Sequence, residues 1–270
     1  MRIAFIGDIV GRPGRTMITT HLQNLKEIHK IDFIIANYEN ASHGFGLSQK
    51  NAKELLNSSI DVMTGGNHSW DKKDIMALLE SEPLLRPLNY PQGVPGSGSA
   101  VFEVSGEKLA VINAMGHFSM PQVDNLFYTV KKEVTRLRDE GIKHIFIDLH
   151  AEATSEKRAL FIYLKEKISA LIGTHTHVGC DDLQIVEGCG YVTDIGLTGC
   201  RDNVIGMEAD EPIKRFKTSI SGRFEVPNKC KAWLQMAVMD LDIEGRCTKM
   251  FKIRRFDDGR EDSYLEAYID

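Results

Sequence analysis

RIAFIG (2–7), RPGRTMITTHLQNLKEIHK (12–30) and DFIIAN (32–37) follow one another at the start of the chain, and this succession decides the fold. The two outer stretches are short apolar runs typical of buried strands. The middle stretch has apolar residues at helical spacing, and Pro13 stands near the first turn, where a helix tolerates proline. A strand, a helix and a strand in this order predict a right-handed crossover between parallel strands.

The alternation continues beyond these residues. Helical spacing recurs at 48–58, where Ser48 is a candidate N-cap, and at 71–81, and a strand pattern lies between them at 61–67. We therefore expect a mainly parallel sheet in this part of the chain.

The second half of the chain has a different pattern. A loop rich in proline and glycine (86–100) precedes two short strands joined by a glycine turn, which predict a hairpin at 100–114. The remaining pattern predicts helices at 123–141 and 155–167 (with Ser155 as cap), strands at 144–150 and 169–175, and an antiparallel hairpin at 232–256. Parallel strands followed by hairpins predict an α/β fold of two packed mixed β-sheets flanked by helices, an α/β/β/α sandwich.

The domain organisation and composition resemble those of an ordinary globular protein. We find no internal repeat or linker, so one domain over 1–270 is expected, with the segment at about 196–228 as a candidate lid. Of the 270 residues, 42% are hydrophobic and 26% are charged, which supplies an ample core. No run of about 18 apolar residues and no signal-peptide pattern is present, so we expect a cytoplasmic protein with no membrane partner.

Charge and cysteine content narrow the possible partners. The formal net charge of −5 argues against a protein that wraps extended nucleic acid, because that requires clustered Lys and Arg. A small anionic substrate remains compatible, since a metal can supply positive charge locally. The five cysteines include no C-x-x-C pair, so we expect reduced thiols rather than a disulfide framework.

Polar residues of a few types gather where the predicted strands end. In α/β sheets, ligands bind in the crevice at the carboxyl ends of the strands. One such residue alone means little, because an Asp after a strand is usually a turn former. Burying the whole set without partners would cost several kcal/mol. The set comprises Asp8, Glu39, Asn40, Asn67, His68, His150, His175 and His177.

The last two members of this set lie in ALIGTHTHVG (170–179). In an extended segment residues two apart face the same side, so His175 and His177 are expected to face the crevice while Thr174 and Thr176 turn away. Oxygen and nitrogen donors without thiolate suit Mn²⁺, Fe or Zn²⁺. The set is too large for one tetrahedral site but fits two adjacent ions, an arrangement suited to in-line displacement at phosphorus.

The order of these motifs resembles that of the calcineurin-like metallophosphoesterases. Five stretches together are similar to the YmdB family, bacterial members that act on cyclic nucleotides, and the similarity runs from residue 1 to about 256. These stretches are FIGDIVGRPGR (5–15), ENASHGFGL (39–47), GGNHSWDKK (65–73), FIDLHAEATSEK (146–157) and IGTHTHV (172–178).

The resemblance implies a calcineurin-like fold, two metal ions and a role for each residue. One ion would be held by Asp8, Glu39, Asn40 and His177, and the other by Glu39, Asn67, His150 and His175, with Glu39 as bridge. Fe or Mn is expected, and Zn or Mg could replace them. A hydroxide held between the metals would attack in line, and His68 would donate a proton to the leaving alkoxide.

The chain departs from the pattern of the resemblance at several positions. Glu39 replaces the aspartate that is the usual bridge of the wider superfamily, and Asn40 takes the place of a missing histidine. Glycine is usual where Tyr38 stands, arginine where His117 stands, and proline where Cys200 stands. We expect Tyr38 and His117 to narrow the pocket or change its phosphate contacts.

The leading hypothesis is a dinuclear-metal phosphodiesterase that opens 2′,3′-cyclic nucleotides. A metal-containing regulatory protein, in which nucleotide or partner binding matters more than turnover, would carry the same donors. A metal-dependent amidohydrolase also uses H-x-H, but there the pair lies on the first barrel strand, whereas here it comes late and GNH precedes it. The sequence leaves open a homo-oligomer.

Overall fold

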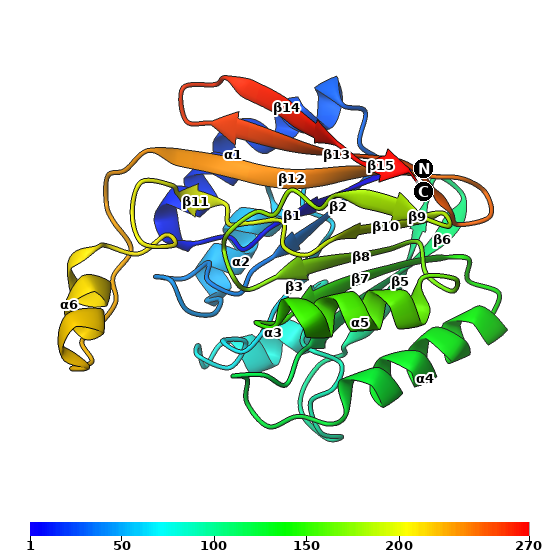
Figure 1. Cartoon of the computed structure of the whole chain (residues 1–270), viewed down its shortest axis with the longest axis horizontal. Coiled ribbons are helices and arrows are strands. Elements are labelled where there is room, and N and C mark those ends of the chain that lie inside the picture. The colour runs from blue at the N-terminus through cyan, green and yellow to red at the C-terminus, as the bar shows by residue number, and fades with distance from the viewer. Residues whose placement is uncertain (270) are drawn as a thin grey trace.

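The computed structural model describes residues 1–269, which form two mixed β-sheets packed face to face with helices on their outer sides (Figure 1). The first sheet contains, in spatial order, β14 (Glu261–Glu266), β13 (Cys247–Phe256), β12 (Ala232–Leu241), β1 (Arg2–Ile6), β2 (Phe33–Asn37), β3 (Val62–Thr64) and β4 (Leu84–Leu85), and β11 (Gly199–Cys200) pairs with β12. Strands β1 to β4 are parallel, whereas β12 is antiparallel to β1 and to β13.

The second sheet has the same mixed character. Its strands are, in spatial order, β15 (Tyr268–Ile269), β9 (Gln184–Val186), β10 (Cys189–Val192), β8 (Ala170–Thr174), β7 (His144–His150), β6 (Glu107–Met115) and β5 (Ser99–Val104). Strands β6, β7, β8 and β10 are parallel, and β5 and β9 are antiparallel to their neighbours β6 and β10. Residues that follow β1, β2 and β3 contact residues at the ends of β7 and β8, so the carboxyl ends of both parallel sets lie at one edge of the sandwich.

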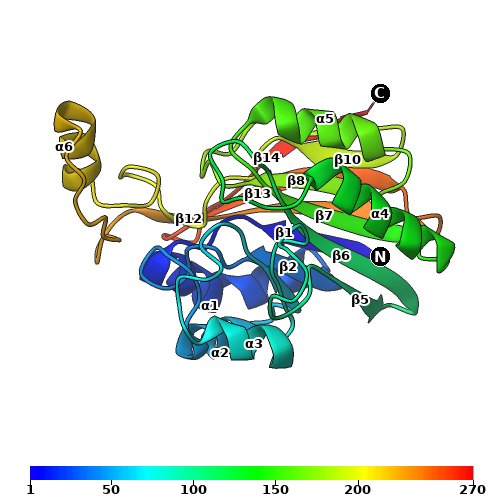
Figure 2. The ribbon, with the colours of Figure 1, turned by 90° about the horizontal axis from the view of Figure 1, so that it is seen from below.

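The helices cover the two outer faces. Figure 2 shows α1 (Gly11–Ile28), α2 (Gln49–Leu56) and α3 (Ile75–Ser81) against the first sheet, and α4 (Leu126–Asp139) and α5 (Thr154–Leu164) against the second. The remaining helix, α6 (Asp210–Thr218), protrudes from the body. Among residues 1–269, no helix combines the length and the apolar character needed to cross a bilayer.

Strand β1 illustrates why the sheets pack in this way. Its residues are apolar on both faces, so each face can be buried. Ile3 and Phe5 belong to the core between the sheets, where the rings of Phe5 and Phe146 lie 5.0 Å apart. Ala4 and Ile6 belong to the core beneath α1. The continuous apolar run that predicted a buried strand is thus shared between two cores.

The fold predicted from the sequence is confirmed, with local differences. The helix expected at 71–81 begins only at Ile75, and Ser155 lies inside α5, whose N-cap position is taken by Ala153 without a side-chain cap. The sequence patterns also missed α6, which lies inside the candidate lid. The expectation of one domain stays a prediction.

The expectation of reduced thiols was wrong for one pair of cysteines. Cys200 and Cys230 form a disulfide, whereas Cys180, Cys189 and Cys247 are free. The pair is 30 residues apart in sequence, but β11 pairs with β12 in a register that places Cys200 opposite Ala232. Strand pairing thus brings the two thiols together, and sequence spacing gives no sign of it.

Candidate metal centre

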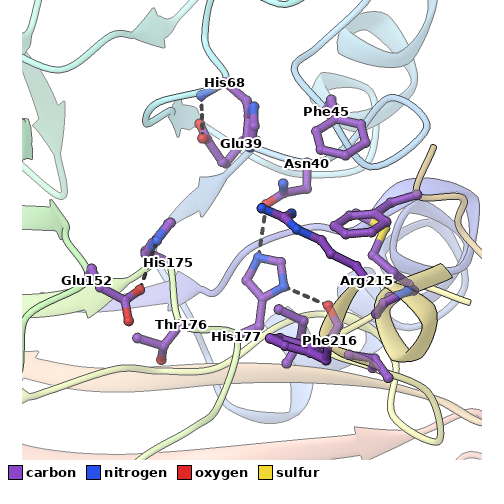
Figure 3. Close-up of a pocket in the computed structure, with 15 residues that line it drawn as sticks. Glu39, Asn40, Phe45, His68, Glu152, His175, Thr176, His177, Arg215 and Phe216 are labelled. Atoms are coloured by element: carbon purple, nitrogen blue, oxygen red, sulfur yellow. Dashed lines mark hydrogen bonds and ion pairs between the residues drawn. The ribbon is translucent and has the colours of Figure 1, made fainter. Parts of the chain in front are cut away.

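The structure brings the predicted polar residues together at the carboxyl edge of the two sheets. Seven of them form two groups of neighbouring side chains. Figure 3 shows the members of these groups that line the pocket, together with His68. Asp8 follows β1, Glu39 and Asn40 follow β2, Asn67 and His68 follow β3, His150 ends β7, and His175 and His177 follow β8.

The first group surrounds the Nε2 atom of His150. This atom lies 3.0 Å from Oδ1 of Asn67, 3.1 Å from Nδ1 of His175 and 3.5 Å from Oε1 of Glu39. The second group surrounds Nε2 of His177, which lies 3.1 Å from Oδ1 of Asn40 and 3.9 Å from Oδ1 of Asp8.

These separations are compatible with atoms that share an ion. Two ligand atoms bound to one ion at about 2.0–2.2 Å, with angles of about 90–110°, lie about 2.8–3.6 Å apart. Four of the five donor separations fall in that range. The separation of 3.9 Å between His177 and Asp8 is slightly longer. The two groups coincide with the two ligand sets that the resemblance implies, except that Glu39 contacts only the first.

The hydrogen bonds of His150 fix which of its nitrogens carries a proton. Thr174 donates its only hydroxyl proton to Oδ1 of Asp148 at 2.7 Å, so its oxygen must accept from Nδ1 of His150, 3.0 Å away. We infer that Nε2 of neutral His150 carries a lone pair, and that this lone pair faces the acceptor oxygen of Asn67.

The other two histidines are held in the same manner. Nδ1 of His177 donates to the backbone carbonyl of Ile205 at 2.8 Å, and Nε2 of His175 lies 3.1 Å from the Glu152 carboxylate. The other ring nitrogens, Nε2 of His177 and Nδ1 of His175, therefore also carry lone pairs. Asn40 donates its amide NH₂ to the carbonyl of Gly44, so its oxygen is the atom that faces His177.

Lone pairs that face one another repel unless a cation lies between them. Protonation of the imidazoles does not resolve this, because burial lowers the pKa of His175 to about 4 and that of His150 well below its usual value. Burial also raises the pKa of Asp8 to about 6 and that of Glu39 well above its usual value. A bound cation would reverse these shifts, because its charge favours the carboxylate and the neutral imidazole.

Two buried atoms point to the same conclusion. Oδ1 of Asp8 and Oε2 of Glu39 are buried, and within residues 1–269 neither has a hydrogen-bond partner. Unsatisfied carboxylate oxygens are costly in a protein interior. The residues present therefore fit a divalent metal ion.

Each candidate donor group includes one amide oxygen. Counting only His, Cys, Asp and Glu side chains, no group of three or more in the described part of the chain could hold a metal ion. Asn67 contributes its Oδ1 atom to the first group, and Asn40 contributes its Oδ1 atom to the second. Each group thus combines imidazole nitrogen with carboxylate and amide oxygen.

The backbone conformation of His175 and His177, which follow β8, differs from the extended one that was predicted. Strand β8 ends at Thr174, and the backbones of His175 and His177 are left-handed, with φ of 103° and 64°. The segment is therefore a turn and not an extended strand. Thr176 does not point away as expected but lines the pocket beside the histidines.

A buried ion pair holds this turn. The Nζ atom of Lys157, on α5, donates to the carbonyl of Thr174 at 2.8 Å and to Oδ2 of Asp194 at 2.9 Å, and both charged side chains have no exposed surface. Asp194 also accepts from the backbone N–H of Thr176 at 3.0 Å. These contacts support the two candidate ligands, His175 and His177, from behind, as the outer partners of metal ligands commonly do.

His68 lies at the pocket but outside the two donor groups. Its backbone N–H donates to Oε1 of Glu39, and its Nδ1 lies 2.9 Å from Oδ2 of Asp71. The sequence reasoning did not identify Asp71, although the spacing of three residues was a signal. Because a carboxylate only accepts, Asp71 orients the ring with Nδ1–H toward itself and leaves Nε2 for other partners.

The pocket above the donors has a volume of about 520 Å³, which is within the range of small-molecule sites. Much of its wall comes from the candidate lid, including Ile205, Arg215 and Phe216. Tyr38 and His117 do not line it, contrary to expectation. Tyr38 is fully buried with its hydroxyl near Ser69, and His117 lines a separate hollow.

The chain is similar in sequence to proteins of one family over almost its whole length. The sequence model of a family described as YmdB-like protein matches residues 4–253. The chain is also 44% identical over 257 residues to the 2′,3′-cyclic-nucleotide 2′-phosphodiesterase of Bacillus subtilis (strain 168), and the match covers 94% of this chain and 96% of that relative.

The fold is also similar to that of solved structures over almost the whole chain. The crystal structure of a hypothetical protein from Thermus thermophilus matches with a TM-score of 0.90 and 37% identity, covering 95% of this chain and 99% of that one. The crystal structure of a novel phosphatase from Mycoplasma pneumoniae matches with a TM-score of 0.89 and 34% identity, covering 95% and 93%.

Proposed function

This chain belongs to the YmdB-like family, and from that premise we propose that it is a metal-dependent phosphodiesterase that hydrolyses 2′,3′-cyclic nucleotides. The observation that carries the proposal is the pair of nitrogen and oxygen donor groups at and beneath the floor of the pocket, with lone pairs that face one another. The activity named for the Bacillus subtilis relative supports the choice of substrate.

The proposed cofactor is a pair of metal ions. Asp8, Asn40 and His177 would hold one ion, and Asn67, His150 and His175 the other, with Glu39 between them. Fe or Mn suits mixed imidazole, amide and carboxylate donors without thiolate, and Zn or Mg could replace them. When bound, such ions offset the charge of a phosphate and lower the pKa of a coordinated water.

His68 is the proposed proton donor to the leaving oxygen. Its side chain is partly exposed to the pocket, and the Asp71 carboxylate holds Nδ1. An edge contact with Phe45, with ring centroids 5.0 Å apart, fixes the plane of the imidazole further. The Nε2 atom of the ring is therefore the one presented to substrate.

An assay of metal-loaded protein tests the proposal. We expect wild type to hydrolyse 2′,3′-cyclic AMP and bis-p-nitrophenyl phosphate with Mn²⁺ or Fe²⁺. Asn67→Ala removes a donor and is expected to abolish activity, and His68→Ala is expected to lower kcat about 10²–10⁴-fold. His21→Gln is a matched control, because His21 lies on α1 and does not line the pocket.

If wild type and the two variants are equally inactive with Mn²⁺, Fe²⁺ and Zn²⁺, the proposal is refuted. Loss of activity in His21→Gln to the level of His68→Ala would also remove the argument for His68. A metal analysis of protein purified without chelator gives the identity and number of the ions.

A further inference from the structure

The candidate lid takes the form of an arm that leaves the body and returns to it, residues 201–229. Cys200 precedes the arm and Cys230 follows it, so the disulfide closes its base. Figures 1 and 2 both show α6, within the arm, standing apart from the sheets. Near the base, Met207 and Phe224 pack with Val10. The arm is thus anchored at its base and extends beside the pocket.

The arm supplies an apolar wall opposite the polar floor of the pocket. Its lining residues include Val204, Ile205, Met207, Pro212, Phe216 and Phe224. The side chain of Phe216 is 87% exposed and that of Ile205 is 50% exposed. Large apolar side chains that gather in an exposed cavity mark a binding surface. A ligand with a charged end for the floor and a flat apolar end for the wall fits this division.

Arg215 is the positively charged residue of this wall. In the view of Figure 3 its side chain extends from α6 toward Asn40 and His177. Its guanidinium carbon lies 5.6 Å from the centre of the Phe224 ring. Within residues 1–269, no carboxylate lies within 4.0 Å of it, whereas the neighbouring Lys214 pairs with Glu211 at 3.2 Å. The charge of Arg215 is thus directed at the pocket and is not neutralised by an acidic side chain.

We propose that the arm is the substrate-recognition element of this enzyme, in which Arg215 binds the phosphate of a nucleotide and Phe216 and Phe224 cover its base. This inference rests on the proposed function, since the phosphate would lie over the donor groups. A guanidinium presents paired N–H donors that match phosphate oxygens. Aromatic faces stack on any base, with a gain of about 1–3 kcal/mol per base.

Binding measurements on variants of the arm test this inference. Adenosine 3′-monophosphate and ribose 5-phosphate are the probes, and the second lacks a base. We expect Arg215→Ala to weaken binding of both probes about 10- to 100-fold, because each loses charge-assisted hydrogen bonds. Arg215→Lys is expected to recover part of the loss. Phe216→Ala is expected to weaken binding of the nucleotide about 5- to 100-fold and to leave ribose 5-phosphate unchanged.

Lys217→Ala is the matched control, because it removes the same charge from the same exposed helix without lining the pocket. We expect its dissociation constants to stay within about twofold of wild type. Calorimetric titration gives the constants, and kcat/KM for 2′,3′-cyclic AMP is measured in parallel.

The outcomes separate this inference from the proposed function. If wild type hydrolyses the cyclic nucleotide but Arg215→Ala and Phe216→Ala bind as wild type does, the arm has no recognition role and the function stands. If binding depends on Arg215 but no cyclic nucleotide is hydrolysed, the recognition role stands and the function fails. If wild type neither binds nor hydrolyses, both are overturned. If Lys217→Ala weakens binding as much as Arg215→Ala does, the effect reflects only the overall positive charge of the helix. That result would overturn the role of Arg215.

Discussion

Replacing Lys157 by methionine is expected to destabilise the protein and loosen the turn that carries His175 and His177. The two side chains have similar length, so the change removes a charge with little change in packing. Lys157 is fully buried, and its ammonium group contacts only acceptors, the carbonyl of Thr174 and the carboxylate of Asp194. The variant therefore leaves a buried carboxylate without its counter-charge.

The structure sets the size of the effect. Breaking a buried ion pair on one side costs about 3–5 kcal/mol. Asp194 keeps two backbone donors, the N–H groups of Thr176 and Gly196, at 3.0 and 2.9 Å. We therefore expect a loss of about 3 kcal/mol in the free energy of unfolding, at the lower end of that range. Lys157→Met/Asp194→Asn, which buries no charge, is expected to recover about 1–2 kcal/mol of it.

Chemical denaturation followed by circular dichroism measures these free energies. Lys132→Met, on the exposed face of α4, is the control and is expected to change stability by less than about 0.5 kcal/mol. Metal affinity of Lys157→Met is expected to fall about 10- to 100-fold, because the turn supports two ligands. A loss below about 1 kcal/mol, or a double variant no more stable than Lys157→Met, would refute the reasoning.

Three further predictions concern the core, the arm and the metal centre. Tyr38→Phe is expected to cost less than about 1 kcal/mol and to leave KM unchanged, because the hydroxyl lies 3.4 Å from Ser69 and outside the pocket; a change in KM of more than about twofold would contradict this. Reduction of the bond between Cys200 and Cys230 is expected to lower the free energy of unfolding by up to about 3–4 kcal/mol, because it opens a loop of 30 residues. Thermal unfolding with and without dithiothreitol, with alkylation and mass measurement of the freed thiols, checks it, and an unchanged Tm would count against a structural role for the bond. Removal of metal by a chelator is expected to lower the Tm by about 5–10 °C, reversibly on addition of Mn²⁺. If chelator and Mn²⁺ both leave the Tm unchanged, the opposed lone pairs do not form a metal centre.

The order of strands and helices could be predicted from the sequence because it depends on local periodicity. The apolar run of Ile3 to Ile6 has to be buried on both faces wherever it lies in the fold. The candidate donors were found for a similar reason. A polar residue that directly follows a buried strand, such as Asp8 after β1, must lie at the carboxyl edge of a parallel sheet.

The wall of the pocket could not be predicted in this way. Helix α6 buries only Pro212 and leaves Ile213 and Phe216 exposed, so its apolar residues do not pack into a core, and their pattern does not indicate that the helix lies near the donors. The same holds for Tyr38, which follows β2 directly, as an edge residue would, and yet points into the core. In both cases the direction of a side chain depends on neighbours that are distant in the sequence.

The sequence by itself thus determined the two sheets, their helices and the types of donor at one edge, because each depends on a local pattern. Only the tertiary structure decided the rest. The lone pairs of His150 and His177 face acceptors because Thr174 and Ile205 hold the opposite ring nitrogens. Arg215 lines the pocket because the arm extends beside it. Such contacts depend on strand register and packing between distant segments, which no local pattern records.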